Sequence, residues 1–139
     1  MKQLGRLSDV EMEVMQVIWG LATPVTVAQL LKIFEDKKGW KTSTISTMLE
    51  RIISKGFLRK EMKGKANYYS IVATLTDYQR QEGRNIISSL YGGSVKNFVA
   101  ALVEDDNITA ADVEELREWF VTSTDGIGKV GISKDGDIK

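Results

Sequence analysis

The chain has 139 residues, of which 42% are hydrophobic and 27% are charged, and it contains a single proline. This composition is typical of a folded globular protein with one domain or two small lobes. There are no cysteines and no histidines, which excludes disulfides, thiol or imidazole catalysis and the usual zinc and copper ligands. No apolar run approaches the roughly 20 residues of a membrane span and no signal peptide is recognisable, so we expect a cytoplasmic protein without membrane insertion.

The formal net charge of zero conceals two halves of opposite sign. Residues 1–70 carry 12 basic and 7 acidic residues, whereas residues 71–139 carry 7 basic and 12 acidic residues. Between residues 41 and 70 the excess is seven basic against two acidic residues. A basic half joined to an acidic half favours a polyanionic partner for the first half only. Taken alone, chance fluctuation would explain the asymmetry equally well.

Capping boxes mark the start of the first two predicted helices. Ser8 with Glu11, and Thr26 with Gln29, have the Ser/Thr-x-x-Glu/Gln spacing of such boxes. Apolar residues then recur at helical spacing in both segments. A break at residues 20–24 separates the two predicted helices.

A third helix is predicted over residues 42–55, and it begins with an unusual cluster of hydroxyl side chains. Ser and Thr compete for backbone hydrogen bonds inside helices, so their concentration at this helix start needs a reason. An apolar stripe follows the helical period, and Gly56 lies where a C-terminal cap is expected. Residues 57–71 then form two short extended runs around a Gly-containing turn, which predicts a β-hairpin.

Three more helices are predicted in the second half of the chain. Thr76 with Gln79 is expected to cap the first, Ser94 to begin the second, and Thr109 with Asp112 to cap the third. After residue 121 the apolar periodicity ends and glycines become frequent. We therefore interpret residues 122–139 as a mobile tail.

The order of three helices, a hairpin and three helices predicts a mainly α fold with a small β-hairpin wing. Residues 1–73 would form a winged helix-turn-helix, and residues 74–121 a lobe of three helices. In a winged helix-turn-helix the third helix enters the DNA major groove with its N-terminal end first. Short hydroxyl side chains there allow close approach and can hydrogen-bond to base edges or phosphates. We expect base contacts from Ser43, Thr44, Ser46 and Thr47, and phosphate contacts from Lys41, Arg51, Lys55, Lys63, Lys65 and Tyr69.

Simpler interpretations exist for each of these features. A Ser/Thr cluster at a helix start commonly serves capping, and a Lys-Gly-Lys turn is commonly just solvated. A winged helix can also dock a partner protein without sequence-specific DNA binding, which is our alternative hypothesis. An enzyme is not expected, because the acidic run at residues 104–106 has no converging catalytic partner. We expect no cofactor and no metal.

Two segments and the predicted wing resemble a known family. The first segment is Ser8-x-x-Glu11-x-x-Val14-Met15-x-x-Ile18-Trp19. The second segment is Trp40-x-x-x-Thr44-Ile45-x-Thr47-x-Leu49-x-Arg51-Ile52-x-x-Lys55-Gly56. Together with Gly64 and Tyr68-Tyr69 of the wing, they are similar to the penicillinase-repressor (BlaI/MecI-like) transcriptional regulators, over residues 7 to about 120.

The resemblance implies a bacterial, homodimeric repressor that binds palindromic double-stranded operator DNA with a TACA/TGTA-like core. It also implies that Thr44 contacts a base and that the three C-terminal helices form the dimer. Independently, about 45 residues bury little core alone, and two interlocked copies would bury more. The expected dimerisation residues are Ile86, Leu90, Val95, Phe98, Val99, Leu102, Val113, Leu116, Trp119 and Phe120.

The chain departs from the family pattern at several points. Relatives often have proline and a longer polar or basic residue where this chain has Thr42 and Ser43, so its operator sequence is left open. The antibiotic-responsive branch is released by proteolysis in the dimerisation lobe, which implies a membrane sensor-protease as a partner. The corresponding bond here is Ala101–Leu102, for which ordinary helix core is the alternative interpretation. The copper-responsive branch uses a cysteine cluster that this chain lacks.

Overall fold

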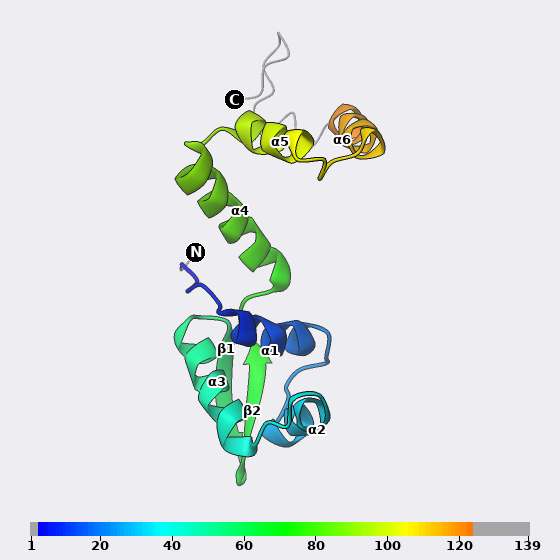
Figure 1. Ribbon diagram of the computed structural model, residues 1–139. Coiled ribbons are helices and arrows are strands. Elements are labelled where there is room, and N and C mark those ends of the chain that lie inside the picture. Colours follow the sequence, from blue (N-terminus) through cyan, green and yellow to red (C-terminus); the bar gives the residue numbers. More distant parts are fainter. Residues whose placement is uncertain (1–2, 124–139) are drawn as a thin grey trace. The chain divides into compact units, whose positions relative to one another are not determined.

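The computed structural model describes residues 3–123, which belong to two compact units that divide between Asn85 and Ile86. The first unit holds three helices, a two-stranded hairpin and the first part of a fourth helix, and the second unit holds the remainder (Figure 1). This confirms the predicted mainly α fold with a small hairpin. The elements are α1 (Asp9–Trp19), α2 (Val27–Lys38), α3 (Thr42–Ser54), β1 (Leu58–Lys63), β2 (Ala66–Ile71), α4 (Leu75–Tyr91), α5 (Val95–Glu104) and α6 (Ala110–Thr122).

The predicted capping boxes of α1 and α2 are confirmed. The Ser8 hydroxyl accepts a hydrogen bond from the Glu11 N–H at 3.2 Å, and the Glu11 carboxylate accepts one from the Ser8 N–H at 2.8 Å. Thr26 and Gln29 exchange equivalent bonds at 3.2 and 2.8 Å. Because each box satisfies two N–H groups that a helix start leaves unpaired, the sequence fixes where these helices begin. The predicted box that opens α6 is confirmed as well.

The start of α4 corrects one prediction. Thr74 and Asp77 form the capping box, with bonds of 3.0 and 3.1 Å, and Thr76 is already inside the helix. Asp77 offers an ionised acceptor at the electropositive helix start, whereas Gln79 would offer only a neutral amide. The backbone and side-chain hydrogen bonds with Thr74 hold the pKa of Asp77 below its usual value. The helix therefore begins at Leu75.

The core of the first unit lies between the three helices and the hairpin. As the apolar stripe of α3 predicts, Ile45, Leu49 and Ile52 are fully buried and Met48 is 8% exposed. The ring of Phe57 lies edge-on to Tyr78 of α4, with centroids 5.0 Å apart. The first turn of α4 is therefore part of the same core.

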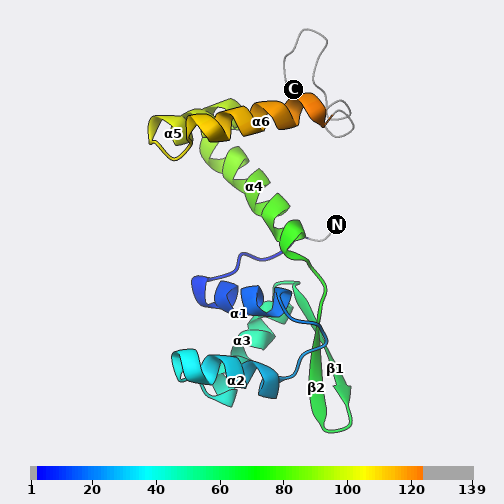
Figure 2. The ribbon, with the colours of Figure 1, turned by 90° about the vertical axis from the view of Figure 1, so that its right-hand side faces the viewer.

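The hairpin pairs antiparallel, from Leu58 opposite Ile71 to Lys63 opposite Ala66. Its two-residue turn begins at Gly64, whose φ of +64° glycine adopts without steric cost. Figure 2 shows the hairpin tip projecting beyond α1, α2 and α3. A further antiparallel bridge joins Val25, between α1 and α2, to β2. The sequence did not predict this bridge.

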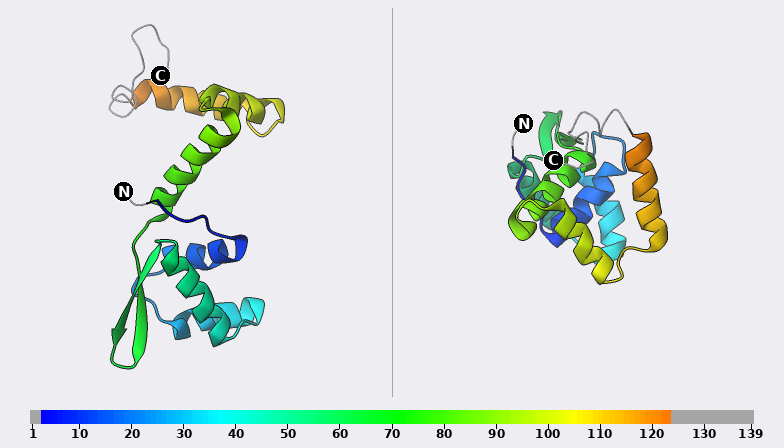
Figure 3. Two further views of the ribbon diagram at one scale, coloured as in Figure 1. Left: turned by 90° about the vertical axis from the view of Figure 1, so that its left-hand side faces the viewer. Right: turned by 90° about the horizontal axis from the view of Figure 1, so that it is seen from above.

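The second unit contains the end of α4 together with α5 and α6, which a short loop joins (Figure 3). No residue of α5 or α6 is buried within the chain. Tyr91 and Phe98 stack edge-to-face at 5.4 Å, and Trp119 and Phe120 do so at 5.3 Å. The unit therefore exposes an extensive apolar surface.

The first compact unit extends past residue 73, the expected end of the winged helix-turn-helix. It continues to Asn85 because Tyr78 and Gln81, which are 4% and 6% exposed, are buried against it. Of the expected tail, only Thr122 and Ser123 lie within the described residues. No single helix between residues 3 and 123 is long and apolar enough to cross a membrane, although α4 and α5 taken together reach the required length and hydropathy.

Candidate nucleic-acid interface

The start of α3 is positioned by packing and has no side-chain cap. Trp40 stacks on Phe34 of α2 with ring centroids 4.9 Å apart, which fixes the chain just before the helix. Lys41 occupies the N-cap position and makes no capping hydrogen bond with its side chain. The start of α3 therefore has no cap from its N-cap side chain, and simple exposure to solvent remains the alternative explanation for the hydroxyl groups of the first turn.

The four residues predicted to contact bases share one end of α3. Ser43 and Thr47 are exposed, and Thr44 and Ser46 are half-buried. The Thr47 hydroxyl donates to the Ser43 carbonyl at 2.9 Å, so its proton is used within the helix. Its oxygen can still accept a hydrogen bond and its methyl group can still pack on an apolar group. The helix start thus presents small donors, acceptors and methyl groups without charge.

Positive charge flanks this hydroxyl patch. Lys41 and Arg51 are both exposed, one before the first turn and the other in the last turn of α3. The acidic residue between them, Glu50, forms an ion pair with Lys60 of β1 at 3.0 Å. This hydrogen bond and the attraction of Glu50 raise the pKa of Lys60. The carboxylate that would repel a phosphate is therefore paired, which sequence reasoning did not foresee because the partners lie on different elements.

The turn of the hairpin carries two more cations. Lys63 and Lys65 flank Gly64 and are exposed. The Lys63 ammonium group lies 6.0 Å from the centroid of the Tyr68 ring, which is half-buried. This is the outer limit of a cation–π contact. The hairpin tip is thus a small, positively charged region at the projecting end of the first unit.

Two residues predicted to contact phosphates have other places in the structure. Tyr69 is 2% exposed, because it lies on the core-facing side of β2 and its backbone pairs with Val25. Lys55 forms an ion pair with the buried carboxylate of Glu11 and donates to the Arg6 carbonyl at 2.7 Å. Both partners of Lys55 belong to the N-terminal part of the fold. We therefore remove Lys55 and Tyr69 from the expected phosphate contacts.

The residues expected at a dimer contact remain accessible within one chain. Leu90 and Val95 are 74% and 60% exposed, and Trp119 is 51% exposed. Ile86, Val113, Leu116 and Phe120 are also exposed, whereas Phe98, Val99 and Leu102 are half-buried. A cavity of about 670 Å³ lies between α5 and Phe120 of α6. These residues give the second unit an exposed apolar surface.

The expected cleavage bond, Ala101–Leu102, lies inside α5. Both residues are half-buried, and their carbonyl groups accept hydrogen bonds from Asp105 and Asn107. A protease would have to unwind this end of α5 to reach the bond. Among residues 3–123, no group of three or more Asp and Glu side chains lies together as metal ligands would.

A family model described as penicillinase repressor matches residues 7–121 of this chain. This chain belongs to the penicillinase repressor family. The penicillinase repressor of Bacillus licheniformis is 29% identical over 84% of this chain and 90% of its own length. The methicillin resistance regulatory protein MecI of Staphylococcus aureus (strain N315) is 30% identical over 80% of this chain and 89% of its own. A solved DNA-binding domain of the repressor BlaI covers 56% of this chain and 94% of its own, with 35% identity and a TM-score of 0.49. The resemblance stated from the sequence is thereby confirmed for the penicillinase repressor family.

Proposed function

We propose that this chain is a homodimeric transcriptional repressor that binds a palindromic double-stranded operator through α3 and the hairpin. The observation that carries the proposal is the start of α3. Its hydroxyl residues lie at a helix end without a side-chain cap, Lys41 and Arg51 flank them, and the carboxylate of Glu50 is paired with Lys60. Membership of the penicillinase repressor family, whose relatives include proteins named as a penicillinase repressor and as a methicillin resistance regulatory protein, supports the same function. Such a protein would act in the cytoplasm and would need neither a cofactor nor catalysis.

The proposed binding mode follows from the geometry of the first unit. The N-terminal end of α3 enters the major groove, where Ser43, Thr44, Ser46 and Thr47 meet base edges. Lys41 and Arg51 bind phosphates on either side, and the hairpin tip binds the adjacent backbone through Lys63 and Lys65. Since these cations release counterions from DNA, binding should weaken steeply as salt rises.

Homodimerisation is proposed from the unburied apolar side chains of α5 and α6. A two-fold dimer would cover this surface and present two copies of α3 to two half-sites about one helical turn apart. For release from DNA, we retain proteolysis at Ala101–Leu102 by a membrane sensor-protease as the proposed route. Cleavage there would divide α5 and so remove part of the dimer contact.

The proposal is tested by fluorescence anisotropy with a duplex that carries the promoter region of this protein's own gene. A scrambled duplex of equal length and base composition is the control, and both are titrated at two salt concentrations. Specific binding is expected to exceed non-specific binding by about 10³-fold or more. Equal affinity for both duplexes under every condition contradicts an autoregulating repressor, and absence of binding at low salt supports the protein-interaction module.

A further inference from the structure

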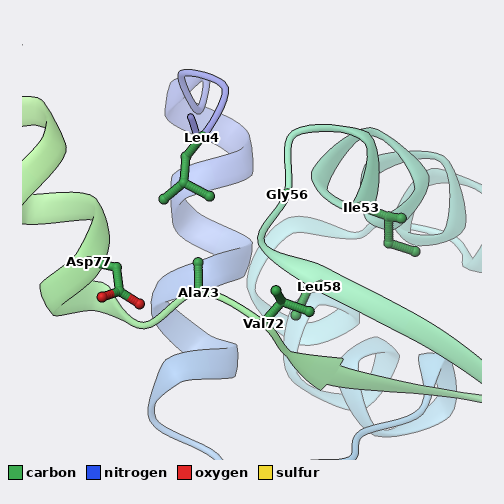
Figure 4. Close-up of a pocket in the computed structure, with 7 residues that line it drawn as sticks. All are labelled: Leu4, Ile53, Gly56, Leu58, Val72, Ala73 and Asp77. Carbon is green, nitrogen blue, oxygen red and sulfur yellow. The ribbon is translucent and has the colours of Figure 1, made fainter. Parts of the chain in front are cut away.

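A cavity of about 420 Å³ lies in the first unit, where the end of α3, the base of the hairpin and the start of α4 meet (Figure 4). Protein interiors are packed so closely that voids larger than a water molecule are few. At about 30 Å³ per water, this cavity corresponds to about 14 water molecules. Its volume falls within the roughly 300 to 1,000 Å³ that is usual for small-molecule sites. The cavity is therefore large enough for a ligand of about ten non-hydrogen atoms.

The wall of this cavity is mainly apolar. Figure 4 shows Leu4 above Ala73, with Ile53, Leu58 and Val72 on one side of them. Leu4, Leu58 and Ala73 are buried, whereas Val72 is 57% exposed, so the cavity opens to solvent beside Val72. Water against such a wall finds few hydrogen-bond partners, and an apolar group that displaces it is stabilised. The wall therefore favours a ligand with an apolar body.

Among residues 3–123, Asp77 in the first turn of α4 is the charged side chain that lines the cavity. Its Oδ2 atom accepts a hydrogen bond from the Thr74 N–H at 3.0 Å, and its other oxygen accepts none from the described part of the chain. Because hydrogen bonds with Thr74 hold the pKa of Asp77 below its usual value, the carboxylate is ionised at neutral pH. The cavity thus offers a negatively charged acceptor beside its apolar wall.

The electrostatics of the cavity favour a cation over an anion. Asp77 offsets the positive end of the α4 dipole, and Ile53 and Gly56 on the opposite wall belong to the end of α3, where the helix dipole is negative. Arg80 attracts the same carboxylate, but it is exposed, and within residues 3–123 no ion pair joins it to Asp77. An anionic ligand would be repelled by Asp77, and a purely apolar ligand would cover the carboxylate without pairing it.

We propose that this cavity is a binding site for a small hydrophobic amine, whose ammonium group pairs with Asp77 and whose apolar body lies against Leu4, Leu58 and Ala73. The site involves neither DNA nor a second chain, so it goes beyond the proposed function and can be tested separately. The cavity of the second unit provides an internal comparison. It is larger, at about 670 Å³, but the charged side chain in its described wall is Lys96. An amine should therefore not bind there.

The first experiment titrates the ¹⁵N-labelled full chain with 2-phenylethylammonium, and follows the amide signals by NMR. The neutral 2-phenylethanol and the anionic phenylacetate are the matched probes, since they differ little in size. The Gly56, Ala73 and Asp77 amides should shift with a Kd of about 1 mM or lower, as expected for a ligand of about nine non-hydrogen atoms. Both matched probes should bind these residues at least about tenfold more weakly. The Val99 and Ala100 amides, in the second cavity, should not respond to the amine.

Variants separate the carboxylate from the apolar wall. Asp77→Asn should weaken binding of the amine by about tenfold and leave binding of the alcohol unchanged. Asp112→Asn is the matched control, because Asp112 caps α6 through bonds of 3.0 and 3.1 Å with Thr109 but does not line the cavity. It removes the same charge and should bind the amine like wild type. Ala73→Leu fills the space below Leu4 and should weaken binding of both probes, while amide signals outside the cavity show that the variant is folded.

Three results would overturn the proposal. One is the absence of shifts at the cavity amides up to about 10 mM amine, which is about ten times the expected Kd. Another is equal affinity for the amine and the alcohol, or an amine affinity that Asp77→Asn leaves unchanged. The third is a shift of the same amides when the protein alone is diluted, which would assign this surface to a contact between two copies of the chain.

Discussion

The Lys55 ammonium group donates a hydrogen bond to the buried carboxylate of Glu11, which lies in the first turn of α1. Lys55 itself directly follows the last residue of α3. The Glu11 side chain is only 4% exposed, and it also accepts from the Ser8 N–H. One carboxylate thus caps α1 and holds the end of α3. Its protonation state therefore matters for both elements.

The first prediction concerns this ion pair and pH. Burial by itself would raise the pKa of Glu11, but the hydrogen bonds from Lys55 and Ser8 and the attraction of Lys55 outweigh burial and hold it below its ordinary value of 4.5. A depressed pKa contributes stability above the unfolded pKa, and this contribution is lost as pH falls through the folded pKa. Glu11→Gln should cost about 2 to 3 kcal/mol of unfolding free energy at pH 7, and less towards pH 3.

Urea denaturation of both proteins between pH 7 and pH 3 measures this difference. Glu13→Gln is the control, because Glu13 pairs with Lys38 at 3.2 Å on the surface, where such a pair contributes under about 1 kcal/mol. If the difference in unfolding free energy between Glu11→Gln and wild type stays constant with pH, the lowered pKa of Glu11 is contradicted.

The second prediction separates base contacts from the rest of α3. Thr44→Ala should lower the preference for the operator over scrambled DNA by about tenfold, which corresponds to about 1.4 kcal/mol, while affinity for scrambled DNA stays the same. Ser54→Ala, at the far end of α3, should leave both affinities unchanged. Competition binding with the two duplexes gives the preference directly, and an unchanged preference in Thr44→Ala would remove it from the base contacts.

The third prediction tests the pairing of Glu50. Lys60→Met would leave the Glu50 carboxylate unpaired beside the proposed phosphate contacts, so affinity for every DNA sequence should fall. The double variant Lys60→Met/Glu50→Gln should recover most of this loss, because the repelling charge is gone. Titrations at low salt show the effect best, since salt screens exposed charges. Equal losses in the single and double variants would mean that only the Lys60 charge matters.

The fourth prediction concerns the apolar surface of the second unit. Leu90→Lys places a charge on a side chain that is 74% exposed in one chain, and a two-fold contact would bury that charge twice. Sedimentation equilibrium should show dimers for wild type and a shift to monomers for Leu90→Lys. Ser88→Lys, also exposed on α4, should remain dimeric. Monomeric wild type at micromolar concentration would argue against the proposed dimer.

The fifth prediction follows from the observed cap of α4. Thr74→Ala should lower the unfolding free energy by about 1 kcal/mol, as the loss of an N-cap does. Thr76→Ala should change it by less than about 0.5 kcal/mol, because Thr76 is exposed inside the helix. Thermal denaturation of the pair, compared with wild type, measures both. A larger effect at Thr76 would restore the cap first expected from the sequence.

Local signals made most of the fold predictable from the sequence. The boxes at Ser8 and Thr26 act over three residues, and the stripe on α3 repeats within one helix, so both can be identified without knowing the tertiary fold. The cap of α4 was predicted wrongly, at Thr76 with Gln79, whereas the structure has it at Thr74 with Asp77. An ionised Asp77 at the electropositive helix start explains the difference.

Interactions between distant parts of the chain explain what sequence reasoning missed at the site. Lys55 was expected to face DNA, but its partner Glu11 lies 44 residues away. No sequence signal predicts that Gln81 is buried and hydrogen-bonded to Leu4, because Leu4 is 77 residues away. Tyr68 and Tyr69 look alike in sequence, and only the pairing of β2 determines which of them turns inward. Such assignments require the tertiary structure.

The unburied helices α5 and α6 have a consequence for the amount of protein in a cell. If their apolar faces are covered only by a second copy, the fraction of paired chains rises with total concentration by mass action. The occupancy of a two-site operator would then rise more steeply than in proportion to the number of gene copies. A repressor that controls its own promoter would consequently stop expression over a narrow range of repressor concentration. Dilution of the repressor as the cell grows would allow expression to resume.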